Sequence, residues 1–298
     1  MASRKRDEQF DERFLRKLDY LYIMSKKIAA GAAKAKRKTH IVGSGLEFAD
    51  HRNYSPGDDM RNIDWKVFGR TNKLFLKLFE EEEDLYIYFL LDTSLSMTLG
   101  KAPTKWDYAK SCEAALGYIG LSNLDRVSII PFSSKLDGRM PPTRGKAQIF
   151  KIFDFLSAVE PGQQTSLKDA FKTFVAQNKR RGIACVISDF YDPTGFEEGM
   201  NYLRYYKFEP IVIHLFDERE LNPKLNGELQ LVDCETGELR EITITEGMLK
   251  RYREVWTEYC EELEEYCSKR NMLYFRAPVQ LPFDDLVLRI FRAGGFLA

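Results

Sequence analysis

The sequence has few of the residues that build common catalytic, disulfide or nucleotide sites. Only 3 of the 298 residues are histidine, and they are scattered at positions 40, 51 and 214, which argues against a serine–histidine–aspartate triad. The 5 cysteines include no C-x-x-C pair, and their scatter favours a reducing compartment and therefore the cytoplasm. The sequence also lacks the G-x-x-x-x-G-K-S/T loop that binds nucleotide phosphates, which argues against an intrinsic ATPase.

The sequence has no excess of either charge and no long apolar run. Lys+Arg and Asp+Glu both number 45, so the formal net charge is zero and we expect no binding of nucleic acid. The longest apolar runs, such as YIYFLL at 86–91, are far shorter than the roughly 20 residues that cross a bilayer, so we expect no membrane insertion. The first residues, MASRKRDEQF, carry charges without a following apolar segment, and we expect no secretory signal there.

Four residues of metal-binding types are interpreted as core residues. Cys185 lies in the apolar run IACVIS, and His214 lies in a predicted strand, where we expect a hydrogen-bonded core histidine. Cys260 and Cys267 are seven residues apart, which places them on one face of a predicted helix. This spacing leaves a metal or disulfide role open, but small buried side chains are the favoured interpretation.

Residues 1–72 are interpreted as an N-terminal helix and an irregular extension that pack on the main domain. Residues 8–33 carry apolar side chains at spacings of three and four, which predicts an amphipathic helix. The basic run KAKRK at 34–38 is interpreted as a solvated loop, with contact to RNA or phospholipid as the alternative.

The segment at 40–72 combines turn formers with aromatic and charged residues but has little periodicity. Because disordered linkers contain few aromatic residues, we expect an ordered loop with a turn at Pro56-Gly57. We expect arginine–carboxylate pairs to hold it together. The charged residues considered for these pairs are Arg52, Asp58, Asp59, Arg61, Asp64 and Arg70. They are interpreted as a structural brace; the alternative is that they form, with Trp65, a surface for partner docking.

From residue 73 onward, predicted strands and helices alternate. Strands are expected at 73–81, 84–92, 127–132, 135–140, 183–189, 210–216 and 272–277, and helices at 104–121, 146–158, 166–180, 195–206, 246–270 and 283–292. Several strands are continuous apolar runs, which is typical of parallel strands covered by helices on both faces. We therefore expect an α/β fold with a doubly wound, mostly parallel sheet over 73–298. A hairpin insertion at about 217–245 is expected to turn at Thr236-Gly237.

Oxygen-bearing side chains follow the predicted strands. Asp92, Ser94 and Ser96 come at the end of one strand, Asp189 comes at the end of another, and Thr165 lies in a loop before a helix. The carboxyl ends of parallel strands share one edge of a sheet, where α/β proteins bind ligands. Because hard cations prefer oxygen ligands, we expect these five side chains to bind Mg²⁺ or Mn²⁺. The alternative is that Asp92 and Ser94 only cap the following turn and that no metal binds.

The order D-x-S-x-S, then Thr165, then Asp189 resembles the metal-ion-dependent adhesion site of von Willebrand A domains. The resemblance implies a von Willebrand A-like fold and a cation that accepts a carboxylate from another protein in its open position. Neutral hydroxyl ligands leave the cation electron-poor, which favours that use.

The segment GLEFADHRNYSPGDDMRNIDWKVFGR, followed by an acidic strand and the DTSLSM turn, resembles the bacterial family called domain of unknown function fifty-eight. The resemblance covers roughly residues 40–192. It implies a von Willebrand A-like domain behind this signature and a MoxR-type AAA+ ATPase as a partner, in an adaptor or chaperone-like role. Some members of the family also carry transmembrane helices, which this sequence lacks.

Three functions are weighed on these residues. The favoured one is a non-catalytic module that binds an acidic residue of a partner protein through the metal. The second is a metal-dependent phosphohydrolase with Asp92 as the nucleophile, although such enzymes carry a carboxylate two residues later, where this chain has Ser94. The third is a structural scaffold that is indifferent to metal.

Overall fold

The computed structural model describes residues 9–35, 42–43, 47–80, 85–162 and 164–294. Contacts between residues divide the chain into a large unit, Met1–Ala29 with Leu85–Ala298, and a small unit, Ala30–Asp84. The division therefore differs from the boundary expected at residue 72. The N-terminal helix groups mainly with the large unit, and the strand predicted at 73–81 groups with the small one. That the extension packs on the main domain stays a prediction.

The large unit is built on a six-stranded sheet with the order β11-β8-β7-β4-β5-β6. Its strands are β4 (Tyr86–Asp92), β5 (Arg126–Phe132), β6 (Met140–Thr143), β7 (Ile183–Ser188), β8 (Glu209–Phe216) and β11 (Leu273–Pro278). All neighbours are parallel except β5 and β6, so the predicted mostly parallel sheet is confirmed, in keeping with a von Willebrand A or Rossmann-like fold. The short strand expected at 135–140 begins later, because a turn closed by Asp137 N–H donating to the Pro131 carbonyl at 2.9 Å precedes it.

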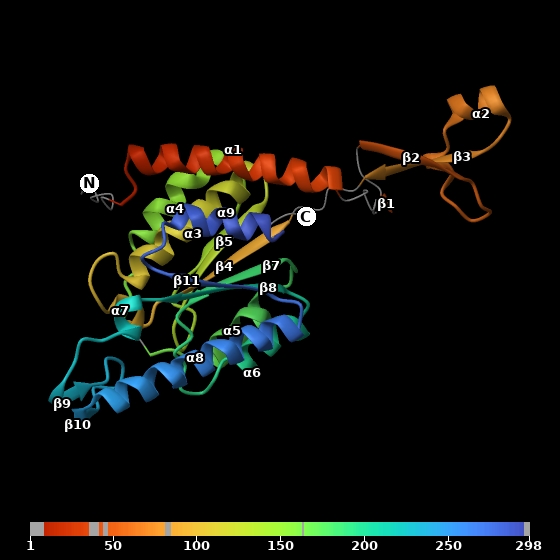
Figure 1. Ribbon diagram of the computed structural model, residues 1–298. Helices are drawn as coiled ribbons and strands as arrows, with labels where there is room; N and C mark the ends of the chain where they lie inside the picture. The colour runs from red at the N-terminus through yellow and green to blue at the C-terminus, as the bar shows by residue number, and fades with distance from the viewer. Residues whose placement is uncertain (1–8, 36–41, 44–46, 81–84, 163, 295–298) are drawn as a thin grey trace. The chain divides into compact units, whose positions relative to one another are not determined.

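Helices cover both faces of this sheet (Figure 1). One face carries α1 (Glu12–Ala35), α3 (Lys105–Ser122), α4 (Ile149–Leu156) and α9 (Phe283–Arg292), and the other carries α5 (Leu167–Gln177), α6 (Glu197–Tyr205) and α8 (Glu246–Lys269). Side chains of β4 alternate between the two cores: Ile87 and Phe89 lie in the first, and Tyr88 and Leu90 lie in the second. A strand buried on both faces must be apolar throughout, which explains the continuous apolar runs.

The interpretation of the cysteines and of His214 as core residues is confirmed. Cys185, Cys260, Cys267 and His214 are all buried, and the cysteines are free thiols. The His214 Nδ1 atom lies 2.9 Å from the hydroxyl of Tyr274, at hydrogen-bonding distance. Within the described parts of the chain, no helix is long and apolar enough to cross a membrane.

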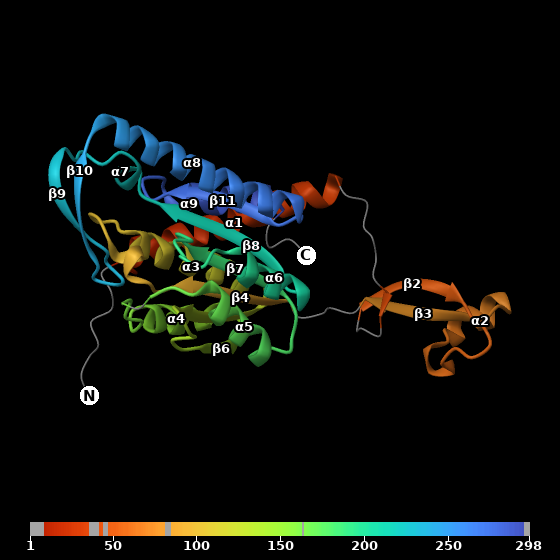
Figure 2. The same cartoon turned by 90° about the horizontal axis from the view of Figure 1, so that it is seen from below.

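The predicted hairpin insertion is present between α7 (Glu218–Leu221) and α8. Its strands, β9 (Gly227–Val232) and β10 (Leu239–Ile244), pair antiparallel with each other and form a separate two-stranded sheet. Both views show the hairpin beside the N-terminal end of α8 (Figures 1 and 2). Gly237 has a φ of +72° in the turn, a backbone conformation that glycine adopts without steric cost.

The small unit is a three-stranded antiparallel sheet with a short helix. Its strands are β1 (Val42–Gly43), β2 (Glu47–Asn53) and β3 (Phe75–Glu80), in the order β1-β3-β2, and the 3₁₀ helix Met60–Asn62 and helix α2 (Trp65–Thr71) lie between β2 and β3. The expectation of an irregular loop at 40–72 was therefore wrong for β2 and α2. The strand β2 is stabilised by pairing with β3, a contact between distant residues that the local sequence pattern does not reveal.

Several expected contacts of this segment are confirmed. Arg52 pairs with Asp58 at 2.8 Å, and Arg61 pairs with Asp59 at 2.7 Å. The Pro56-Gly57 turn is closed by the Asp58 N–H, which donates to the Ser55 carbonyl at 3.0 Å.

Candidate metal centre

The predicted site lies where the order of the sheet reverses. The chain passes from β4 to β5 on one side of it and later returns to β7 on the other, so β4 has neighbours from both directions. At such a point the loops that follow two adjacent strands diverge and leave a crevice at their carboxyl ends. Asp92 ends β4, and Asp189 directly follows β7. The topology therefore brings these two carboxylates to the same crevice, as predicted.

Asp92 is fully buried and held by two donors. Its Oδ1 accepts a hydrogen bond from the Ser94 N–H at 2.9 Å, and its Oδ2 accepts one from the Ser188 hydroxyl at 2.5 Å. Burial, together with the negative charge of nearby Asp189, raises the pKa of Asp92. Two buried carboxylates that repel each other are stabilised by a cation between them.

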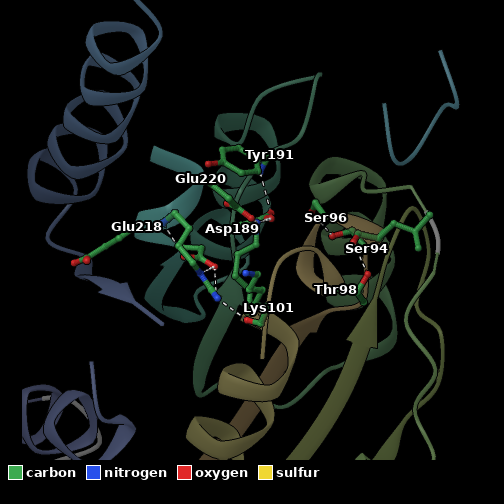
Figure 3. Close-up of polar contacts among 12 residues, drawn as sticks. Ser94, Ser96, Thr98, Lys101, Asp189, Tyr191, Glu218 and Glu220 are labelled. Carbon is green, nitrogen blue, oxygen red and sulfur yellow. Dashed lines mark hydrogen bonds and ion pairs between the residues drawn. The ribbon is translucent and has the colours of Figure 1, made fainter. Parts of the chain in front are cut away.

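Ser94 and Ser96 lie in the turn after β4, at the start of the 3₁₀ helix η2 (Leu95–Thr98) (Figure 3). Both side chains are buried, and their hydroxyl oxygens are 2.9 Å apart. Ser94 precedes η2, but its hydroxyl makes no capping hydrogen bond to that helix. The alternative of a simple helix cap therefore does not hold for Ser94, whereas Asp92 does brace the turn through the Ser94 amide.

Thr165 reaches the same crevice from the loop before α5. The Gly162 N–H donates to the Thr93 carbonyl at 2.9 Å, which ties this loop to the turn after β4. Asp192 holds the other end, because its Oδ2 accepts from the Leu167 N–H at 2.7 Å. Thr165 is only 8% exposed, and its Oγ1 is buried without a hydrogen-bond partner among the described residues. A buried hydroxyl without a protein partner takes its hydrogen bond from water or coordinates a bound ion.

Asp189 is paired with a lysine that the sequence analysis did not identify. The Lys105 Nζ atom lies 2.9 Å from Asp189 Oδ2 and 2.9 Å from Glu220 Oε1, and both Lys105 and Asp189 are almost completely buried. The ammonium also lies 5.1 Å from the centre of the Tyr191 ring. Burial alone would lower the pKa of Lys105, but the charges of Asp189 and Glu220 raise it above its ordinary value. Lys105 therefore stays charged and neutralises part of the acidic site.

A cavity of about 810 Å³ is lined by one of the five predicted residues, Ser96. Its wall includes Ser96 from the turn after β4, Lys105 and Glu220 from the buried ion pair, and Glu235 from the turn of the β9–β10 hairpin. Sequence reasoning missed Lys105, Glu220 and Glu235, because none of them belongs to a motif that points to this site.

The donors at this crevice fit a hard cation. Asp92 and Asp189 offer carboxylate oxygens, and Ser94, Ser96 and Thr165 offer hydroxyl oxygens, which are the ligands that Mg²⁺ and Mn²⁺ prefer. In the described parts of the chain, no three His, Cys, Asp or Glu side chains lie together as a metal site. The Thr165 hydroxyl has no hydrogen-bond partner among the described residues, and a bound cation would satisfy it directly or through water.

Comparison with known proteins places the chain in a family. Residues 50–261 match the family described as protein of unknown function DUF58. The chain belongs to the DUF58 family. It is also 26% identical over 208 residues to uncharacterized proteins of Mycobacterium bovis and Mycobacterium tuberculosis. The matched part covers 68% of this DUF58 chain but only 65% of those relatives, less than two thirds of their length.

Solved structures with a related chain path include two proteins of Bacteroides. BatB of Bacteroides thetaiotaomicron has a TM-score of 0.45 at 15% identity, and the match covers 69% of this chain and 96% of that one. An aerotolerance-related membrane protein of Bacteroides fragilis also has a TM-score of 0.45, at 17% identity and with the same coverage of both chains.

Proposed function

We propose that this DUF58 protein is a non-catalytic binding module that uses a metal ion to hold an acidic residue of a partner protein. The ion would be Mg²⁺ or Mn²⁺, and its ligands would be Asp92, Ser94, Ser96, Thr165 and Asp189, directly or through water. The observation that carries the proposal is the buried Thr165 Oγ1, which lacks a hydrogen-bond partner among the described residues at the crevice where the two carboxylates meet.

The composition of the site supports binding of an acidic group. Three of the five expected ligands are neutral hydroxyls, and Lys105 pairs with one of the two carboxylates. A bound divalent cation would therefore keep much of its positive charge. Such a cation attracts a further carboxylate, and the cavity beside Ser96 provides the access.

The sequence that follows Asp92 argues against the alternative of a phosphohydrolase. The position two residues later, where such enzymes carry a second carboxylate, is Ser94.

The resemblance to the DUF58 family extends the proposal to a partner. The family resemblance implies a MoxR-type AAA+ ATPase, with the metal centre used to hold that enzyme or a protein that it remodels. In this role the chain would be an adaptor or chaperone-like factor of the cytoplasm.

The test is thermal unfolding with and without Mg²⁺ or Mn²⁺. A metal at ten times its dissociation constant stabilises the folded state by about 1.4 kcal/mol, which raises the melting temperature of a domain of this size by roughly a few degrees. We expect this rise for the natural chain and no rise for Asp92→Ala. The variant Asp154→Ala changes an exposed aspartate of α4 and should keep the full rise.

Two outcomes would contradict the proposal. A natural chain whose melting temperature is unchanged at millimolar Mg²⁺ and Mn²⁺ would remove the metal centre. Hydrolysis of a generic phosphate ester that depends on both Mg²⁺ and Asp92 would replace the binding role with an enzymatic one.

A further inference from the structure

Exposed apolar side chains gather in one segment of the large unit. Of the 17 large apolar side chains that are exposed in the described parts of the chain, 7 lie between residues 225 and 255. They are Leu225, Leu231, Val232, Leu239, Met248, Tyr252 and Val255. This segment comprises the β9–β10 hairpin and the first turns of α8, which lie side by side in both views (Figures 1 and 2). Apolar side chains that gather on a surface mark a place of contact with another protein.

The β9–β10 hairpin leaves one of its two faces bare. In the register of the strands, Val232 lies opposite Leu239 and Gln230 lies opposite Glu241, so these four side chains share one face. All four are exposed, with Val232 at 62% and Leu239 at 58%. On the other face, Ile244 is buried. The bare face therefore combines an aliphatic pair with a carboxylate.

The first turns of α8 carry a second exposed apolar surface, which includes an arginine. Four exposed residues at positions i, i+3, i+4 and i+7 share one side of this helix and are named here the α8 stripe: Met248, Arg251, Tyr252 and Val255. Arg251 pairs within the helix with Glu254 at 3.4 Å and with Glu258 at 3.5 Å. Its side chain is 64% exposed, and exposed pairs of this kind contribute little to stability. The Arg251 guanidinium can therefore exchange these contacts for another carboxylate.

The hairpin and the start of α8 are complementary in charge. Residues 227–244 contain five carboxylates and a single basic side chain, that of Arg240, which pairs with Glu238. Residues 247–253 contain Lys250, Arg251 and Arg253 and no acidic residue. Surfaces of opposite charge attract each other, and surfaces of like charge repel. Because the bare hairpin face and the α8 stripe are both exposed, they do not cover each other within one chain.

We propose that these two surfaces join two copies of the chain, with the bare hairpin face of each copy on the α8 stripe of the other. Two-fold symmetry forms this contact twice, so the segment is complementary to itself. The aliphatic pair of the hairpin packs on the apolar residues of the stripe, and Glu241 of one copy meets Arg251 of the other. Contact of hairpin with hairpin would instead bring like charges together.

The dimer also gives the hairpin a support that it lacks in the single chain. The strands β9 and β10 form a two-stranded sheet of their own. Such a hairpin is marginally stable in water unless other elements pack on it. The second copy would cover the face that carries Val232 and Leu239. The inference goes beyond the proposed function, because neither surface contains an expected metal ligand.

The test is sedimentation equilibrium of the full chain over a wide range of concentrations. We expect the average mass to rise from that of one chain to that of two in the micromolar range, as is usual for a small interface. Val232→Lys and Leu239→Lys each place an ammonium group in the bare face and should weaken association on the order of tenfold. Tyr205→Lys makes the same change at an exposed tyrosine of α6 and should associate like the natural chain.

An exchange of charges tests which surfaces meet. Glu241→Arg and Arg251→Glu each bring like charges together in the dimer and should weaken association about tenfold. When the two variants are mixed, both contacts of the mixed dimer join opposite charges, so association should return to that of the natural chain. Recovery in the mixture also shows that each variant is folded. Lys151→Glu, at an exposed lysine of α4, is the control for the change of charge.

Three outcomes would overturn the inference. A natural chain that stays a single copy at millimolar concentration would leave the surface to a different partner. Association that is unchanged in Val232→Lys and Leu239→Lys would mean that the interface lies elsewhere. Mixed charge variants that do not associate would show that the hairpin and α8 do not meet. None of these measurements involves a metal ion, so the metal centre is tested separately.

Discussion

At the scale of single residues, Lys105 is the side chain that most changes the expected chemistry. It lies between Asp189 and Glu220 and is almost fully buried, so it would compete with the proposed metal ion for Asp189. A metal ion and an ammonium group could share Asp189 only if each made a weaker interaction. Lys105 would thus limit the affinity of the proposed site for metal, and its ion pair holds Asp189 in position.

The variant Lys105→Met tests this role. Without metal, it leaves the buried Asp189 and the half-buried Glu220 without their cation, and removal of one partner of a buried pair costs about 3–5 kcal/mol. We expect a lower melting temperature in metal-free buffer and a larger rise on addition of Mg²⁺ than in the natural chain. Lys101→Met, which removes an exposed lysine of the same cavity, is the control. A metal-induced rise that is equal in Lys105→Met and the natural chain would show that Lys105 does not compete.

At the scale of elements, α2 in the small unit depends on one aspartate. Asp64 precedes this helix and accepts hydrogen bonds from the amides of Lys66 at 2.9 Å and Val67 at 3.1 Å. The other oxygen of Asp64 lies 3.0 Å from the Nε2 atom of His51, which is a residue of strand β2. One carboxylate therefore joins the helix to the sheet of the small unit.

Substitution of Asp64 should loosen α2 in two separable steps. Asp64→Ala removes the cap, which costs about 0.5–2 kcal/mol of local stability, whereas Asp64→Asn keeps an acceptor for the amides and loses only the charge. The hydrogen bond from His51, then the amides of Val67 and Lys66 and the charge of Lys77, lower the pKa of Asp64 to about 2. Amide hydrogen exchange of residues 65–71 measures both effects.

The pH dependence of this contact has a definite sign. The folded pKa of about 2 lies below the ordinary value of 3.8, so the folded state binds fewer protons than the unfolded state between these values. The stability that the charge of Asp64 adds relative to Asp64→Asn should be fully present above about pH 4 and should disappear as the pH falls towards 2. An advantage that persists at pH 2 would mean that the charge of Asp64 is not its source.

At the scale of the whole molecule, the grouping of contacts predicts which segments a bound metal protects from amide hydrogen exchange. The expected ligands come from three loops at one edge of the large sheet, while residues 30–84 group as a unit of their own. We expect Mg²⁺ to slow amide hydrogen exchange at the ends of β4 and β7 and in the loop before α5. Exchange in residues 47–80 should be unchanged. Protection of residues 47–80 by Mg²⁺ would instead couple the small unit to the metal centre.

The large fold, and the placement of Asp92 and Asp189 at one edge of its sheet, could be predicted because their signals are local. Continuous apolar runs indicate strands buried on both faces, and alternation of strands and helices indicates a parallel sheet. The D-x-S-x-S segment lies within five residues at one strand end, and the rule for ligand positions in α/β sheets adds Asp189.

Only the tertiary structure decided what surrounds these residues. Lys105 begins a helix, Glu220 lies in a short helix after β8, and Glu235 lies in a hairpin turn, and none of these positions carries a pattern that points to the crevice. The strand β2 likewise depends on pairing with β3 and not on its own periodicity. Local sequence determines which face of an element is apolar, whereas long-range pairing and packing determine which polar groups are enclosed together. The ion pairs of Lys105 at the candidate metal centre belong to the second kind.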